Sequence, residues 1–81
     1  MLESEARQAA EMLRKEAKVP QGAPLTKAVK RYIEIAKQAP DGKWLARDFL
    51  AWVVHFSEDA AFWEVVLDDA TGKLLRTDRS R

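Results

Sequence analysis

The hydrophobic pattern of the first residues predicts a helix. Over residues 3–18, small apolar side chains recur at spacings of three and four, at Ala6, Ala9, Ala10, Leu13 and Ala17. This spacing places them on one narrow stripe of an amphipathic helix. Val19-Pro20 ends the helix, because the residue before a proline is pushed out of the helical region. Since the stripe is mostly alanine, we expect the helix to lie close against its partner and to bury little area.

The pattern over residues 26–38 predicts a second helix. Thr26 can cap its start, and one helical face would carry Leu25, Val29, Tyr32, Ile33 and Ala36. The same stretch also contains β-branched residues, and Ile33 and Ile35 alternate with charged positions, so a strand over residues 29–37 stays open as an alternative. Pro40-Asp41-Gly42 then predicts a turn, because proline presets its own φ and glycine accepts a positive φ.

The last third of the chain predicts β structure. Trp52-Val-Val-His-Phe56 and Phe62-Trp-Glu-Val-Val-Leu67 indicate strands over about 49–56 and 62–68, and a third follows at 73–77. Asp69-Ala-Thr-Gly72 predicts a hairpin loop between the last two. Residues 43–48 fit either a strand or a short helical turn. We therefore expect one α+β domain over residues 1–81, with two N-terminal helices packed on a three-stranded antiparallel β-meander.

Both faces of this predicted sheet carry apolar side chains. Since side chains alternate along a strand, Trp52, Val54 and Val65 belong to the core face. The opposite face still holds apolar residues, diluted by three polar ones: Phe49, Val53, Phe62 and Val66 with His55, Glu64 and Asp68. An antiparallel sheet with one solvated face should alternate more cleanly. Either the two helices, or one helix and the loop in the 40s, cover both faces, or the mixed face pairs with a second copy of the chain, or it receives a different protein.

The length and charge of the chain argue against several classes of site and partner. A chain of 81 residues has one small core, which argues against an enclosed active site. The net charge of +1 comes from 14 basic and 13 acidic side chains that are interspersed, which argues against nucleic acid and anionic lipid as partners. No apolar run is long enough for a membrane span, and no signal region is visible. We expect a cytoplasmic protein, or an extracytoplasmic one only if a signal peptide has been removed.

The candidate chemistry is sparse. His55 is the only histidine and there is no cysteine, so we expect no metal site, no cofactor and no enzymatic activity. His55 is expected to face Glu64 or Asp68 across the sheet. Asp68 and Asp69 are adjacent, point to opposite faces and are expected to bond to the hairpin turn. Trp44 is expected to be partly exposed and available as an anchor for a partner.

Residues 50–77 resemble PepSY-type domains and, less directly, the end of small cystatin-like immunity proteins. The resemblance rests on the strand opening with Trp52, the aromatic-rich strand from Phe62, and the Asp69-Ala-Thr-Gly-Lys73 turn into a final apolar strand. It implies an α+β fold that binds or inhibits another protein, with no catalytic residues.

The sequence thus predicts a non-enzymatic protein-binding module, of an inhibitor or immunity type, that acts through an apolar sheet face or edge and forms a homodimer. The expected binding residues are Trp44, Val53, His55, Phe62 and Val66. The alternative is a small-ligand-binding protein or minimal enzyme with a cleft between helices and sheet, in which His55 and Tyr32 supply the polar groups.

Overall fold

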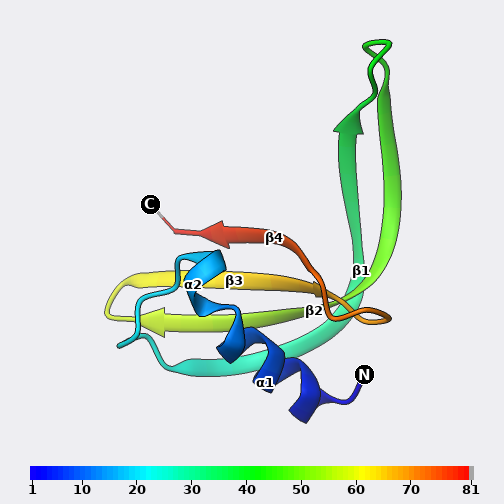
Figure 1. Ribbon diagram of the computed structural model, residues 1–81. Coiled ribbons are helices and arrows are strands. Elements are labelled where there is room, and N and C mark those ends of the chain that lie inside the picture. Colours follow the sequence, from blue (N-terminus) through cyan, green and yellow to red (C-terminus); the bar gives the residue numbers. More distant parts are fainter. Residues whose placement is uncertain (81) are drawn as a thin grey trace.

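The computed structural model describes residues 1–80 and shows a four-stranded antiparallel sheet with helices on one face (Figure 1). The strands follow one another in the order β1-β2-β3-β4. The elements are α1 (Glu3–Met12), α2 (Arg14–Ala17), β1 (Leu25–Gln38), β2 (Trp44–Glu58), β3 (Ala61–Asp68) and β4 (Leu74–Arg79). The α+β class is as expected, but the meander has four strands where three were predicted.

The prediction of a helix over residues 26–38 is wrong, because this segment is β1. It pairs with β2 without a register shift from Lys27↔His55 to Gln38↔Trp44. As a strand it places Val29, Ile33 and Ile35 on one face. The physical reason is hydrogen bonding to β2. Without β1, the backbone N–H and C=O groups along one whole edge of β2 would lack partners. Tertiary pairing thus outweighs the local helical spacing.

The second strand is longer than predicted. It begins at Trp44, so the ambiguous residues 43–48 are almost entirely strand, and it runs to Glu58 rather than ending at Phe56. The predicted turn at residues 40–42 is confirmed. The Gly42 N–H donates to the Ala39 carbonyl at 2.9 Å, and Gly42 has φ +87°, which glycine adopts without strain.

The first predicted helix is present in two pieces. It is interrupted at Leu13, between α1 and α2, and it ends where Val19-Pro20 was expected to end it. Lys18 adopts a left-handed conformation with φ 60°, and the Val19 N–H donates to the Arg14 carbonyl at 2.9 Å. This is the closing geometry in which the last carbonyls of a helix find donors.

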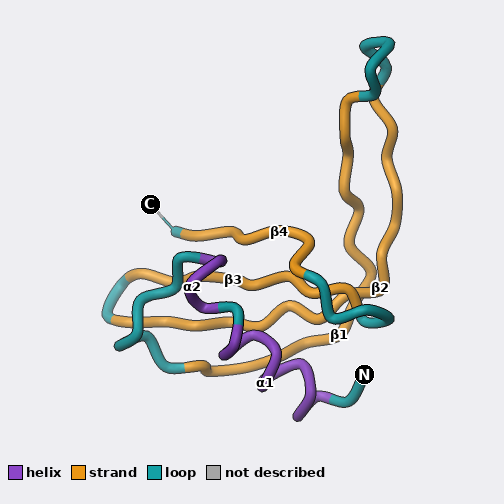
Figure 2. The backbone as a smooth tube through the Cα atoms, viewed as in Figure 1, coloured by secondary structure: helices purple, strands orange, loops and turns teal. Residues whose placement is uncertain are grey.

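The main core lies between the helices and one face of the sheet, which we call the helix face (Figure 2). Alanines Ala6, Ala10 and Ala17 pack there against large residues from β2 and β3: Trp52, Val54, Phe56, Val65 and Leu67. The small alanine side chains let the helix lie close to the sheet, as the sequence predicted.

The opposite face, which we call the open face, carries no helix but has a small core of its own. Ala51, Val53 and Val66 are buried there together with Ile33. Partly buried Ile35 and Leu75 pack against this cluster. Of the interpretations left open by the sequence, coverage of both faces by helices is therefore wrong, yet the valines of the open face are covered by other segments of the chain itself.

The outer half of the β1–β2 hairpin projects away from the sheet (Figures 1 and 2). The strand β3 pairs with β2 only from Ala51 onward, so residues 33–49 form a ribbon of just two strands. We call residues 33–49 the arm.

Candidate functional site

The arm carries the most exposed large apolar side chains of the sheet. Tyr32, at its base, is 74% exposed, Trp44 69% and Leu45 61%. An isolated two-stranded ribbon is at best marginally stable in water, because each strand has only one neighbour and neither face is covered. An exposed apolar ribbon of this kind is typical of a surface that contacts another molecule.

The two faces of the arm differ in charge. On the side continuous with the open face, Ile35, Lys37, Leu45, Arg47 and Phe49 line a shallow hollow. The guanidinium of Arg47 lies 5.1 Å from the centre of the Phe49 ring. This face is apolar with two cations.

The other face of the arm is continuous with the helix face of the sheet. Strand alternation and the β1–β2 register place Glu34 opposite Asp48 there, next to Ala36 opposite Ala46. Trp44 lies on the same face at the tip, opposite Gln38. This face therefore carries two carboxylates and an exposed indole.

The residues predicted as a binding surface do not form one surface. Val53 and Val66 are only 4% and 1% exposed, so they belong to the core of the open face and cannot contact a partner without unfolding. Trp44 is exposed as expected, but at the tip of the arm rather than beside the valines. The surplus of apolar residues on the second sheet face thus indicated a second small core.

His55 and Glu64 face each other across β2 and β3, as expected. Their side chains approach to 3.4 Å, and the His55 ring stacks on Phe62 with 5.3 Å between ring centres. Phe62 is 37% exposed at the far end of the open face. This group is partly covered and is remote in register from the tip of the arm.

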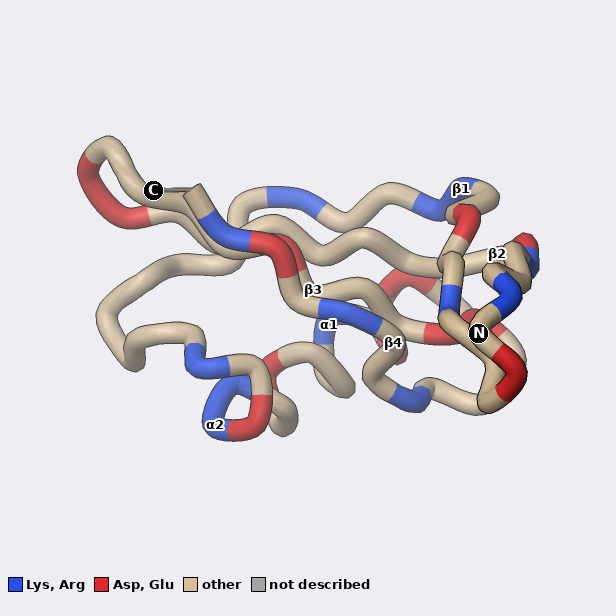
Figure 3. The backbone as a smooth tube through the Cα atoms, turned by 90° about the horizontal axis from the view of Figure 1, so that it is seen from above, with Lys and Arg blue, Asp and Glu red and all other residues tan. Residues whose placement is uncertain are grey.

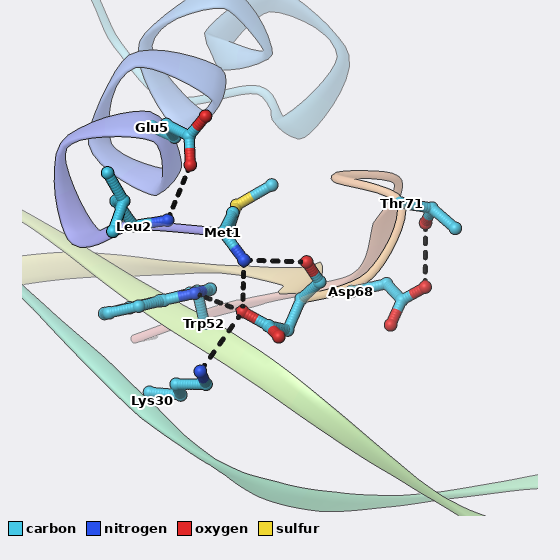
Figure 4. A network of polar contacts seen from close by, with 8 residues as sticks. Met1, Leu2, Glu5, Lys30, Trp52, Asp68 and Thr71 are labelled. Carbon is cyan, nitrogen blue, oxygen red and sulfur yellow. Dashed lines mark hydrogen bonds and ion pairs between the residues drawn. The ribbon is translucent and has the colours of Figure 1, made fainter.

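A polar network that the sequence did not reveal joins the N-terminal end of the chain to β2 and the β3–β4 turn (Figure 4). Its centre is the Asp69 carboxylate, which accepts hydrogen bonds from the Met1 ammonium at 3.0 Å and from the Trp52 indole N–H at 2.8 Å. Lys30 Nζ lies 3.6 Å from the same oxygen. The Met1 ammonium first, and then Trp52 and Lys30, hold the pKa of the Asp69 carboxyl below its ordinary value.

The neighbouring aspartate has the local role predicted for the pair. The Asp68 carboxylate accepts a hydrogen bond from the Thr71 hydroxyl at 2.7 Å, within the β3–β4 turn that contains Gly72. The prediction that both carboxylates serve the turn therefore holds for Asp68 and is wrong for Asp69. The indole of Trp52 was the available signal, because a buried indole N–H requires an acceptor.

The polar groups proposed for an enzymatic cleft are not brought together. Tyr32 lies at the base of the arm, on the helix face of the sheet, and His55 lies on the open face. Over residues 1–80, no three His, Asp or Glu side chains gather in an arrangement suited to a metal ion. Neither helix in that range has the length and hydrophobicity to cross a membrane.

The charges are interspersed over the molecule. Figure 3 shows basic and acidic segments alternating along the tube. Such an arrangement gives little long-range steering toward a polyanion.

Comparisons with protein-family models, curated protein sequences and solved structures give no significant match for this chain. The geometry and chemistry of the arm therefore carry the functional argument.

Proposed function

We propose that this chain is a non-enzymatic protein-binding module and that the arm is its working surface. The observation that supports the proposal most directly is the ribbon of residues 33–49, which projects from a covered sheet with Trp44 and Leu45 exposed on its opposite faces. A chain with so small a core gains nothing for its own folding by exposing these side chains.

A protein partner suits the arm better than a small molecule does. The hollow beside Leu45 opens to solvent on a ribbon of only two strands, whereas small-ligand sites are concave and bury most of the ligand. Tryptophan at the centre of a protein contact typically contributes a large share of the binding energy. We therefore expect substitution of Trp44 to cause the largest loss of affinity for the partner.

The resemblance of residues 50–77 to PepSY-type and cystatin-like domains supports the same mode of action. Members of such families bind or inhibit other proteins, and an inhibitor or immunity-type role for this chain is part of the proposal. The working surface differs from the first expectation, because Val53 and Val66 are buried.

The test compares the wild-type chain with the arm variant Trp44→Ser/Leu45→Ser. A control, Met12→Ser, removes a side chain that is 77% exposed on the helix, far from the arm. Each protein is immobilised and exposed to a lysate, and the bound proteins are identified and then measured one by one for affinity. We expect the control to bind as the wild type does and the arm variant to lose at least about tenfold in affinity, a modest effect for a hot-spot residue.

Equal affinity of all three proteins for every partner would contradict the arm as working surface. Circular dichroism and thermal unfolding of each variant test whether its sheet remains intact, and only variants with an intact sheet enter the comparison.

The small-ligand alternative has one observation in its favour, the hollow in which Lys37 and Arg47 flank an apolar floor. That chemistry fits an organic acid with an apolar chain. A thermal-shift series with such acids would raise the unfolding midpoint if the hollow binds them, and Lys37→Gln would cancel the shift. Midpoints unchanged up to millimolar concentrations would remove this alternative.

A further inference from the structure

The edge of β2 within the arm has backbone groups with no partner strand. In an antiparallel ladder, successive residues direct their N–H and C=O groups to opposite sides of the strand. The Lys43 carbonyl accepts the Ala39 N–H at 2.7 Å, so Lys43 faces β1. The Leu50 carbonyl accepts the Asp69 N–H at 3.0 Å, so Leu50 faces away from β1.

The residues between these two follow by alternation, because the β1–β2 register has no shift in the arm. Trp44, Ala46 and Asp48 therefore direct their N–H and C=O groups outward, away from β1. The next strand, β3, reaches β2 only at Ala51. Within residues 1–80, the outward backbone groups of these three residues have no strand beside them.

We propose that a second copy of this chain pairs antiparallel with this edge, with the two Ala46 residues facing each other on a two-fold axis. The inference rests on the proposed function, since it names the partner that the arm takes. Addition of a strand to an exposed edge is a general mode of protein recognition. A two-fold axis closes the contact, so the product is a dimer and not a filament.

This register uses all the free groups of the edge. With Ala46 opposite Ala46 of the second copy, Trp44 lies opposite Asp48 of the second copy, and the reverse pair forms by symmetry. Each of these is a hydrogen-bonded pair, because the three residues are those whose backbone groups point outward. The arm would then become a ribbon of four strands, two from each copy, which is the range in which sheets become stable.

The side chains of the edge favour the same register. Residues directly opposite in a sheet share a face, so Leu45 would lie beside Arg47 of the second copy, and no like charges meet. Centring the pair on Arg47 would put two guanidinium groups opposite each other and would need the Leu50 carbonyl, which Asp69 already occupies. Centring it on Leu45 would place Lys43 opposite Arg47. Both shifted registers bring like charges together, which is destabilising.

The other two edges of the sheet are less suited to a second copy. The outer edge of β1 carries four basic residues against one acidic residue, so two such edges would repel each other: Lys27, Lys30, Arg31 and Lys37 against Glu34. The edge strand β4 is short, and its pairing with β3 has a register shift between Val66 and Leu67. Charge and irregularity are the devices by which edges avoid pairing. The arm edge of β2 carries one Arg and one Asp, whose charges cancel, and its register with β1 has no shift in the arm.

The test uses two proline variants that differ only in the edge they block. Ala46 and Ala36 lie directly opposite each other in the arm, and both direct their N–H groups outward, Ala46 at the β2 edge and Ala36 at the β1 edge. Proline removes an N–H and is tolerated in strands where that group faces solvent. Ala46→Pro and Ala36→Pro should therefore cost the hairpin the same, while only Ala46→Pro blocks the proposed edge.

The solution mass of the three proteins is measured by size-exclusion chromatography with light scattering across a concentration series. We expect a dimer for the wild type and for Ala36→Pro, and a dissociation constant raised at least about tenfold for Ala46→Pro. A dimer that Ala36→Pro disrupts and Ala46→Pro leaves intact would overturn the proposal in favour of the β1 edge. A dimer that neither variant affects would also overturn it.

A second variant keeps the proposal testable if proline disturbs the hairpin. The chain has no cysteine, so Ala46→Cys supplies a single thiol per copy. Across a hydrogen-bonded antiparallel pair the Cα atoms lie about 5.5 Å apart, and the Cβ atoms lie farther apart than the about 3.5–4.5 Å that a disulfide requires. A short bis-maleimide that spans this gap should give a covalent dimer of Ala46→Cys faster than of Ala36→Cys, and equal rates would overturn the inference.

Failure of this inference and failure of the proposed function have different signatures. A wild-type chain that stays monomeric at the highest concentration overturns the pairing with a second copy. If Trp44→Ser/Leu45→Ser still loses binding to another protein in that case, the arm remains the working surface and only its partner was wrong.

Discussion

The indole N–H of Trp52 donates to Asp69 Oδ1 at 2.8 Å, which fastens the β3–β4 turn to the middle of β2. The carbonyl of Leu50 accepts the Asp69 N–H next to it, so the turn is held by both its backbone and its side chain. This attachment lies where β3 and β2 part and the arm begins.

Replacing Trp52 by Phe removes this hydrogen bond while keeping most of the ring volume. We expect the thermal midpoint to fall by about 4–8 °C, the shift for one typical hydrogen bond in a domain of this size. The matched control is Trp44→Phe, because Trp44 is exposed and its loss should leave the midpoint nearly unchanged. Equal midpoints for the two variants would show that the Trp52–Asp69 bond adds no stability.

The pH dependence of stability follows from the lowered pKa of Asp69. Because the folded pKa lies below the unfolded value, the unfolded state binds more protons in acid, and stability falls as the pH drops below about 4. Asp69→Asn should remove part of this slope and leave stability above pH 5 nearly independent of pH. The measurement is the urea midpoint between pH 2 and pH 6, and an unchanged acid slope in Asp69→Asn would contradict the assignment.

Arg14 is a buried cation that joins the helices to the sheet. Its guanidinium pairs with Glu11 at 2.6 Å, donates to the Pro20 carbonyl at 2.7 Å and lies 4.5 Å from the centre of the Phe56 ring. Hydrogen bonding to Glu11 raises the pKa of Arg14 further, so the group stays charged. We expect Arg14→Ala to cost about 2 kcal/mol, from lost packing, cation–π contact and hydrogen bonds.

The control for Arg14 is Arg7→Ala. Arg7 pairs with Glu3 at 2.9 Å, but both side chains are exposed, and such a pair contributes about 0.5 kcal/mol or less. Denaturant unfolding measures both variants, and similar losses would mean that the burial of Arg14 has no energetic consequence.

Charge substitution of the valines on the open face tests its core. Val53→Glu and Val66→Glu would each bury a carboxylate without a partner, and we expect each to cost more than about 3 kcal/mol. Val29→Glu is the control, because Val29 lies opposite Val53 on the same face but is 44% exposed. If Val53→Glu folds as stably as Val29→Glu, the open face is a docking surface after all.

Shortening the arm tests whether it serves folding or binding. Ile35 and Arg47 are opposite each other, and by alternation they form a hydrogen-bonded pair, which a two-residue Asn-Gly turn can close in place of residues 36–46. Because the two cores lie outside the deleted residues, we expect the free energy of unfolding of the shortened chain to lie within about 1 kcal/mol of the wild-type value. We also expect the shortened chain to lose binding to its partner and self-association. Unfolding of the shortened chain would show that the outer arm supports the fold.

Much of the local structure could be predicted from the sequence because it depends on neighbours along the chain. The alanine spacing predicted the first helix, Val19-Pro20 its end, and Gly42 and Gly72 the two turns in which a glycine takes a positive φ. The alternation around Val54 and Val65 predicted two of the strands and the core face beneath the helix.

The role of β1 depended on partners far along the chain. A spacing of four between Leu25, Val29 and Ile33 fits a helix equally well, and only β2, whose other edge would lie open, decides for a strand. Two of the predicted binding residues, Val53 and Val66, are core residues for a related reason. Apolar residues on a second face look the same in sequence whether they await a partner or are covered by their own chain.

The sequence by itself determined the α+β class of the fold, its small helix-covered core and its turns, since these follow from composition and local spacing. The tertiary structure decided which apolar residues stay exposed to solvent. Because β3 ends its pairing at Ala51 and the base of the arm packs over Val53 and Val66, the exposed apolar residues lie on the arm, with the edge of Trp44, Ala46 and Asp48 beside them. That arrangement arises from pairing and packing between distant segments, which no local pattern records.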